Sequence, residues 1–154
     1  MRIGILSDTH GLLRDEVIEA LTGCDMIFHA GDINNREIIN RLMNIAVTYV
    51  VRGNNDKDWA ADLPEFLDTT AGNLHIFMTH KKKDLPKDLS PYDLVIIGHS
   101  HRYVETKDGR TVILNPGSCG PRRFDQEITL AVAETGADRL QIRKIAIPHK
   151  EKEK

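Results

Sequence analysis

Short apolar runs rich in Ile, Val and Phe recur along the first hundred positions of the chain. They lie at residues 2–6, 26–28, 46–51, 74–78 and 94–97. Runs of this length with little polar alternation are typical of strands that are buried on both faces of a sheet. The pattern therefore predicts five buried strands.

Helical periodicity separates the first three of these runs. Residues 13–21 carry an apolar side chain at every fourth position, and residues 38–43 form a second apolar stripe. Asn34 or Asn35 is a candidate N-cap for the second helix. Alternation of strand and helix predicts parallel pairing with right-handed crossovers.

The C-terminal third changes to pairs of runs joined by turn signals, at residues 103–107 with 111–114 and 128–132 with 140–147. The first pair flanks Asp108-Gly109, a strong signal for a two-residue hairpin, and the second flanks a turn around Gly136. This part is expected to be mainly antiparallel. The whole pattern predicts an α/β fold of two packed sheets with helices outside.

Composition indicates one ordinary globular domain. The chain has 154 residues, 40% of them hydrophobic and 29% charged, which is the size of one core rather than two. We expect a single domain at residues 1–148 and a solvated, alternating-charge tail at 149–154. With no targeting segment before the first strand and no apolar run near the ~18–20 residues that span a bilayer, the expected location is the cytoplasm, without membrane contact.

Charge and cysteine content narrow the function classes. The formal net charge of −2 gives no overall basic field, so nucleic acid is not the expected partner. Cys24 and Cys119 are far apart in the sequence and lack Cys-x-x-Cys spacing, which predicts two reduced thiols rather than a disulfide.

Each of the five apolar runs ends in a small residue that is followed by a side chain able to bind a metal. These side chains are Asp8 with His10, Asp32, Asn54, His80, and His99 with His101. In parallel sheets, ligands bind beyond the carboxyl ends of the strands, so residues distant in sequence become neighbours there. A single Asp after a strand is more often a cap or turn residue, but five such placements together predict one metal site.

The donor set indicates which ions fit. Two carboxylates, one amide oxygen and four imidazoles, without a thiolate, suit Mn, Fe, Zn, Ni or Co and are too rich in nitrogen for calcium. Seven ligands suffice for two ions if one carboxylate bridges them. His29 remains open between packing and orienting a ligand, whereas His75 and His149 are assigned to strand packing and to the exposed tail.

These residues resemble the motifs of the calcineurin-like metallophosphoesterase superfamily. The ordered set is Asp8-x-His10, Gly31-Asp32, Gly53-Asn54-Asn55-Asp56, His80 and Gly98-His99-Ser100-His101. The short chain and Asn115-Pro116-Gly117-Ser118 are similar to its small bacterial and archaeal YfcE-like phosphodiesterase subgroup. The resemblance implies a four-layer α/β/β/α sandwich with two mixed β-sheets.

The resemblance also implies how the ligands divide between two divalent ions, with Mn most expected and Ni, Fe, Zn or Co as alternatives. One ion would be held by Asp8, His10, Asp32 and His101, and the other by Asp32, Asn54, His80 and His99. Asp32 would then be the bridging carboxylate and, with Asn55, a catalytic residue. Asp56 would orient a metal-binding histidine from behind it.

Two departures from the superfamily pattern concern the substrate. Asn55 stands where many members have a His. An amide can donate a hydrogen bond to phosphate but cannot act as a general acid. The absence of a general acid at this position favours diester substrates. Residues 81–83 are three lysines, which form either a cationic rim for an anionic substrate or a solvated loop. Arg122, or equally Arg123, is a candidate phosphate contact.

The predicted function is hydrolysis of small phosphodiesters by in-line attack of a hydroxide that bridges two metal ions. The alternative from another class is an inactive scaffold with the same fold, like the retromer subunit that resembles this family. A phosphomonoesterase or a nuclease stays open, although 5% aromatic residues and one short lysine run disfavour a nuclease. The oligomeric state, including a homo-oligomer, is left open.

Overall fold

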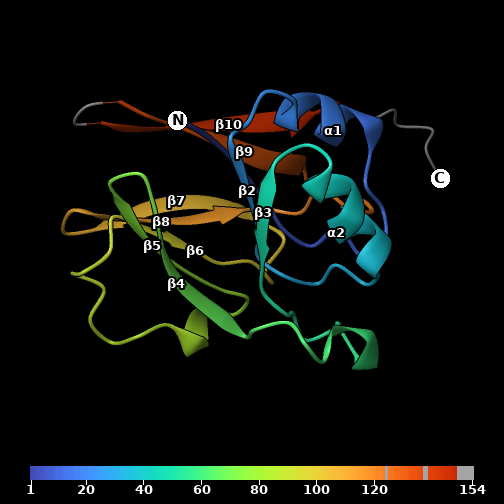
Figure 1. Ribbon diagram of the computed structural model, residues 1–154, viewed down its shortest axis with the longest axis horizontal. Helices are drawn as coiled ribbons and strands as arrows, with labels where there is room; N and C mark the ends of the chain where they lie inside the picture. The colour runs from blue at the N-terminus through green and yellow to red at the C-terminus, as the bar shows by residue number, and fades with distance from the viewer. Residues whose placement is uncertain (124, 137–138, 149–154) are drawn as a thin grey trace.

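The computed structural model describes residues 1–123, 125–136 and 139–148. Two five-stranded mixed sheets pack face to face, and two helices lie against one of them (Figure 1). The charged tail at 149–154, with His149, lies outside the described residues.

The first sheet contains both ends of the described chain. Its strand order is β10 (Leu140–Ile147), β9 (Ile128–Thr135), β1 (Arg2–Leu6), β2 (Met26–His29) and β3 (Val47–Val50). The strands β1, β2 and β3 run parallel, as the strand–helix alternation predicts, while the β9–β10 hairpin joins β1 antiparallel.

The helices α1 (Asp15–Leu21) and α2 (Arg36–Met43) make the two predicted crossovers. The Asn35 side chain accepts a hydrogen bond from Ile38 N at 3.1 Å, so Asn35 rather than Asn34 caps α2. Apolar side chains of both helices, including Val17 and Leu42, pack on the outer face of the first sheet.

The second sheet has the order β4 (Phe66–Ala71), β5 (Leu74–Thr79), β6 (Leu94–Ile96), β8 (Thr111–Pro116) and β7 (Tyr103–Asp108). The predicted hairpin around Asp108-Gly109 is β7–β8, although β8 also pairs parallel with β6. The pattern did not predict β4, an edge strand whose side chains are mostly exposed or half-buried. The five predicted strands are therefore divided between two sheets.

The main core lies between the sheets, where Ile5 and Phe28 of the first meet Met78 and Ile96 of the second. The outer face of the second sheet carries no α-helix among the described residues; the segment 80–93, with the 3-10 turn η2 (Lys82–Asp84), covers it instead. The α/β fold of two mixed sheets is confirmed, with one outer layer built of loop.

Two further expectations can be compared with the fold. Cys24 and Cys119 are both buried and free, as predicted for reduced thiols. Within the described part of the chain, no helix is both long and apolar enough to cross a membrane.

Candidate metal centre

The two sheets bring the carboxyl ends of five strands to one place. His80 Nδ1, after β5, lies 2.7 Å from Ala30 O, after β2, and His99 N, after β6, donates to Asp8 Oδ2, after β1, at 3.1 Å. The sequence pattern placed these strand ends along one parallel edge, whereas they meet across the interface between two sheets. All seven predicted ligands converge there.

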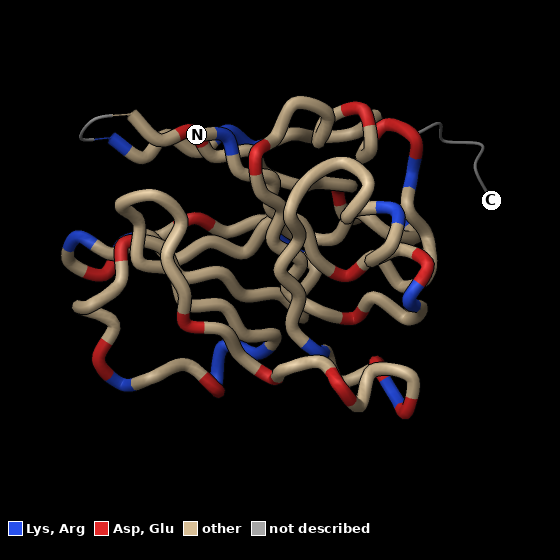
Figure 2. The backbone as a smooth tube through the Cα atoms, in the orientation of Figure 1, with Lys and Arg blue, Asp and Glu red and all other residues tan. Residues whose placement is uncertain are grey.

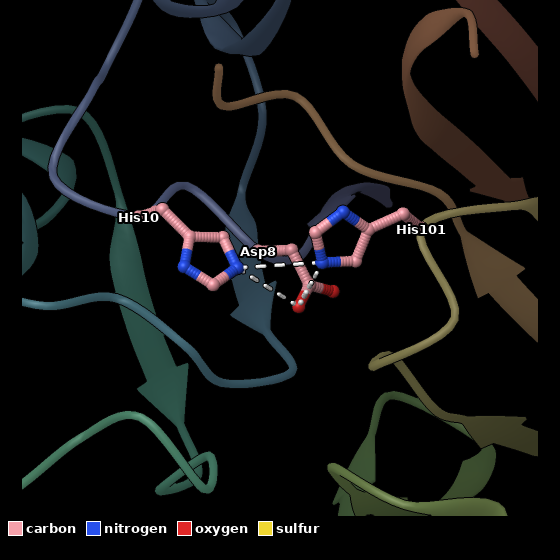
Figure 3. A group of neighbouring side chains, drawn as sticks. All are labelled: Asp8, His10 and His101. Carbon is pink, nitrogen blue, oxygen red and sulfur yellow. Dashed lines mark hydrogen bonds and ion pairs between the residues drawn. The ribbon is translucent and has the colours of Figure 1, made fainter. Parts of the chain in front are cut away.

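The first donor group consists of Asp8, His10 and His101 (Figure 3). Asp8 Oδ1 lies 3.6 Å from His10 Nε2 and 3.3 Å from His101 Nε2, and the two Nε2 atoms are 3.3 Å apart. Three potential ligand atoms thus face a common point, with one imidazole coming from a loop of each sheet.

The second donor group consists of Asp32, His80 and His99. Asp32 Oδ2 lies 3.3 Å from His80 Nε2 and also 3.6 Å from His10 Nε2 of the first group. Asn54 Oδ1 adds a further oxygen, 3.1 Å from His99 Nδ1. Asp32 therefore reaches toward both groups, and Asn54 belongs to the second.

Two buried polar atoms of the centre have no hydrogen-bond partner among the described residues. They are Asp8 Oδ1, in the first group, and His80 Nε2, in the second. Buried polar atoms without partners are rare because leaving them unpaired is unfavourable. A cation in each donor group would pair both atoms, and the mixed oxygen and nitrogen donors suit a borderline divalent ion.

Electrostatics keep the first carboxylate charged. Burial opposes ionisation of Asp8, but interactions with His10, His101 and Ser7 outweigh burial and hold the pKa of the carboxyl well below its usual range. The Ser7 hydroxyl donates to Asp8 Oδ2 at 2.7 Å. Asp8 is therefore an anion at neutral pH, ready to bind a cation.

The second group has an ionised carboxylate and two unequal imidazoles. Burial also opposes ionisation of Asp32, but interactions with His80 and Asn55 lower the net pKa of its carboxyl. Burial lowers the pKa of His80, yet the Asp32 carboxylate outweighs burial and raises the net value. Burial, together with the positive charges of His80 and Lys81, lowers the pKa of His99.

The backbone at the centre is strained. Six described residues other than glycine have positive φ, and five of them are predicted ligands: Asp8 (57°), His10 (44°), Asp32 (59°), His99 (77°) and His101 (64°). The left-handed conformation is unfavourable for residues with a Cβ by roughly 1–2 kcal/mol each, and such strain gathers at functional sites.

Glycines before the ligands permit close approach, as the sequence predicts. A Cβ on Gly53 would meet Asp32 Oδ1 at 2.2 Å and Asp32 N at 2.3 Å. A Cβ on Gly98 would meet Ser7 Oγ at 2.2 Å. Both positions lack space for a side chain because a ligand-bearing loop passes over them.

Asp56 holds two of these loops together through the backbone. Its carboxylate accepts hydrogen bonds of 2.8–2.9 Å from four amides, those of Asp32, Ile33, Asn34 and Gly53. We expected this residue to orient a histidine, but it makes no hydrogen bond to one among the described residues. It fixes the backbone of Asp32 and of the loop that carries Asn54 instead.

Asn55 contacts the carboxylate shared by the two groups. Its backbone N–H donates to Asp32 Oδ1 at 2.8 Å, and its side-chain Nδ2 donates to Asp32 Oδ2 at 3.3 Å. The side chain is exposed at the edge of the centre. An amide with one hydrogen directed at Asp32 retains a second hydrogen for another acceptor.

The remaining predicted residues are the lysines at 81–83 and the two arginines at 122 and 123. A cavity of about 370 Å³ beside the second donor group is lined by residues that include Arg52, Lys81 and Lys83. The exposed Arg122 donates from Nε to Gln126 O at 3.3 Å, and Arg123 is exposed as well.

The end of β8 and the residues that follow it support the loops that carry Asp8 and His99. Ser118 Oγ donates to Asp8 O at 3.0 Å, and Asn115 Nδ2 donates to Gly98 O at 3.0 Å. The sequence singled out Asn115-Pro116-Gly117-Ser118 only by resemblance. Its role as a brace between loops depends on contacts between residues 17 and 110 positions apart, which no local pattern reveals.

A two-sheet α/β fold with two adjoining oxygen- and nitrogen-donor groups at its strand ends defines the class of metal-dependent phosphoesterases. The sequence profile described as the calcineurin-like phosphoesterase superfamily domain matches residues 1–138. The chain belongs to the calcineurin-like phosphoesterase superfamily, as its ordered motifs predict.

Three similar proteins illustrate the relationship. A phosphodiesterase of Methanocaldococcus jannaschii is 32% identical over 77% of this chain and 84% of its own length. The solved structure of an archaeal phosphodiesterase has a TM-score of 0.81 at 26% identity, covering 96% of this chain and all of that one. Vps29 of Entamoeba histolytica, solved as a zinc complex, has a TM-score of 0.72 at 19% identity, covering 95% and 99%, and shares the fold.

Proposed function

We propose that the protein is a phosphodiesterase with two divalent ions, acting on small phosphodiesters. The observation that carries this proposal is the position of Asp32, whose Oδ2 lies within 3.6 Å of imidazole nitrogens in both donor groups. A carboxylate so placed can serve two ions at once. The superfamily's divalent-metal chemistry and the phosphodiesterase named among the relatives support the same conclusion.

The proposed ligand sets follow the two donor groups. Asp8, His10, Asp32 and His101 would hold one ion, and Asp32, Asn54, His80 and His99 the other. Two ions so held supply a nucleophile from water at neutral pH and neutralise charge on the phosphoryl oxygens. Manganese is the proposed ion, since an oxygen-containing set without thiolate accommodates it.

Asn55 is the proposed contact to the phosphoryl group. One hydrogen of its amide is directed at Asp32, and the other can donate to a non-bridging oxygen as charge develops there. Because an amide has no proton to give up at accessible pH, the leaving group must depart without help from Asn55. This favours diesters and esters with acidic leaving groups over alkyl monoesters.

The cavity beside the second donor group is the proposed place for one ester substituent. Lys81 is close enough to lower the pKa of His99 together with burial and His80, so its charge is felt at the centre. Acidic residues, among them Glu65 and Asp84, line the same cavity, which makes it mixed in charge rather than basic. Arg122 or Arg123 is the proposed contact on the other side.

The alternatives are less well supported. A scaffold is under no selection to keep metal donors, yet all seven donor positions are filled and convergent here. The likeness to Vps29 is one of fold. In the view of Figure 2, basic and acidic positions are interspersed along the backbone, and the formal net charge is −2, which disfavours a nuclease that tracks a polyanion.

The test is a screen of metal-free protein reconstituted with Mn²⁺ against cyclic nucleotides, dinucleotides, glycerophosphodiesters and phosphomonoesters. We expect diester hydrolysis that a chelator abolishes and that Asp32→Asn reduces by at least about a hundredfold. Asp108→Asn, at the exposed end of β7, is the matched control for the carboxylate-to-amide change and should retain full activity. Full activity in Asp32→Asn would refute the bridging assignment, and absence of metal-dependent hydrolysis would favour a scaffold.

A further inference from the structure

A fully buried histidine lies behind the metal centre and, within the described part of the chain, makes no hydrogen bond to a ligand side chain. His29 ends β2, and its Nδ1 accepts a hydrogen bond from Gly31 N at 3.1 Å. Since Nδ1 accepts, the ring proton must be on Nε2, which lies 3.0 Å from Thr9 Oγ1 and donates to it. Burial lowers the pKa of His29 to about 4, which keeps the ring in this neutral form at neutral pH.

Thr9 connects this imidazole to the first donor group. It stands between Asp8 and His10, both in the left-handed conformation, and its side chain is fully buried on the side away from the ligands. Its hydroxyl accepts from His29 and donates to Ile33 O at 3.4 Å. The direction of the Thr9 side chain therefore sets the directions of the two ligands that flank it.

His29 connects the same hydroxyl to the second donor group. Gly31, whose N–H it accepts, precedes Asp32 and has φ of +104°, and a Cβ there would meet His80 Nδ1 at 2.8 Å. The two loops also pair through the backbone, Asp8 N to Gly31 O at 3.0 Å and His10 N to Asp32 O at 2.9 Å. The neutral imidazole adds a side-chain tie between the same two loops, beside the longer contacts of Thr9 Oγ1 with Ile33 O and of Ser7 Oγ with Gly31 O.

We propose that His29 is a positioning residue that, through the Thr9 hydroxyl, holds the two donor groups at the separation two ions require. The proposal rests on the dinuclear centre proposed above. It assigns a role in the site to a histidine that contributes no ligand atom. Loss of the tie should weaken both ions together, whereas loss of a ligand weakens chiefly its own.

Thr9→Val removes the contact with His29, together with the hydrogen bond from the Thr9 hydroxyl to Ile33 O. Valine keeps the shape of threonine but cannot accept from Nε2, so a buried donor loses its partner and the loop bearing Asp8 and His10 is no longer held. Partners behind metal ligands contribute about tenfold to a hundredfold in metal affinity. Thr9→Ser restores the hydroxyl and should restore affinity.

The matched control is Thr111→Val. Thr111 is also fully buried, and its hydroxyl donates to Leu89 O at 2.9 Å and Tyr92 O at 2.7 Å, outside the metal centre. The Thr111→Val variant measures how the loss of a buried threonine hydroxyl changes stability when the metal centre is not affected. His29→Gln serves as a second variant, because its amide can replace only part of the imidazole's pair of contacts.

The experiment is calorimetric titration of each metal-free protein with Mn²⁺, with the visible spectrum of the Co²⁺-loaded form as a structural readout. We expect two bound ions in the wild type, both about tenfold or more weaker in Thr9→Val with an altered Co²⁺ spectrum, and recovery in Thr9→Ser. Thr111→Val should lower the melting temperature and leave both affinities and the spectrum unchanged.

The outcomes separate this proposal from the one on which it depends. Two ions in wild type with unchanged affinities in Thr9→Val, or weakening of one ion alone, would overturn the positioning role while leaving the dinuclear centre intact. Equal weakening in Thr111→Val would also overturn it, since stability would then explain the effect. Fewer than two ions in the wild type would overturn both.

Discussion

At the scale of single residues, the chain places its ligands in a conformation that their side chains disfavour. Of the residues that the structure describes, six other than glycine have positive φ, and five of these are proposed ligands. Their backbones are held by specific partners, such as the Asp56 carboxylate on four amides. Residue type and position after a strand were readable in the sequence, but the conformation was not, because it depends on these long-range contacts.

Gly53→Ala tests how tightly the ligand loops are packed. The new Cβ would lie within 2.3 Å of Asp32 atoms, so Asp32 must move away from the second donor group. We expect diester hydrolysis to fall by about a hundredfold or more, with loss of one of the two ions on metal analysis. Gly136→Ala, where a Cβ meets nothing within 4 Å, is the control and should be near neutral.

The amide at position 55 predicts a leaving-group dependence. Without a general acid, the rate of the wild type should rise steeply as the leaving group becomes more acidic across a series of aryl phosphodiesters. Asn55→His introduces a group able to donate a proton and should make the rate depend less on leaving-group acidity. Asn55→Ala should lower the rate with every leaving group and keep the steep dependence. A flat series in the wild type would argue against unassisted departure.

At the scale of elements, the sequence predicted most strands and the pairing of neighbours along the chain, but not the pairing of strands that are distant in sequence. Runs of buried Ile, Val and Leu located β1, β2, β3, β5 and β6, and turn residues located both hairpins. The strand β4 was not predicted because Asp68 and two threonines give this edge strand little apolar character. Two packed sheets were predicted, but the strands of each sheet were not, since β9 returns to pair with β1 across most of the chain and β10 then pairs with β9.

The β4–β5 hairpin carries a pH-sensitive contact. We expected His75 to pack within its strand, and its ring centroid lies 4.6 Å from that of Tyr92. Its Nε2 also lies 2.5 Å from Asp68 Oδ1. This contact with the carboxylate raises the pKa of His75 above its usual value. The folded state therefore binds the proton more tightly than the unfolded state.

The sign of the effect on stability follows from that shift. The contribution of His75 is fully present below its unfolded pKa of about 6.5 and is lost as pH rises through the higher folded value. The melting-temperature difference between wild type and His75→Gln should therefore be larger near pH ~5.5 than near pH ~8.5. Tyr92→Phe, which removes the other donor to Asp68, should show no such trend over this range.

At the scale of the whole molecule, the proposed ions connect the two sheets. The first donor group takes Asp8 and His10 from a loop of the first sheet and His101 from one of the second. The second donor group likewise combines Asp32 with His80 and His99. Family and fold were predictable from the ordered motifs, but this sharing across the interface required the packing of the sheets.

Metal removal should therefore destabilise the entire fold. An ion at about a hundredfold excess over its dissociation constant stabilises the native state by about 2.7 kcal/mol. For a chain of this size, each ion then corresponds to roughly 5–10 °C in melting temperature. Scanning calorimetry of Mn²⁺-loaded and chelator-treated protein should show this difference, and Asp32→Asn should show a smaller one.

Ligands shared between the sheets also affect how long the protein survives heating. If the proposed ions are bound, imidazoles of one sheet would have to leave ions that carboxylates of the other still hold before the layers could separate, so opening the core would also release an ion. Lifetime at high temperature follows the rate of unfolding rather than its equilibrium. In the metal-loaded protein, the dissociation rate of the ions would then determine how long the enzyme stays active on heating, whatever its catalytic rate.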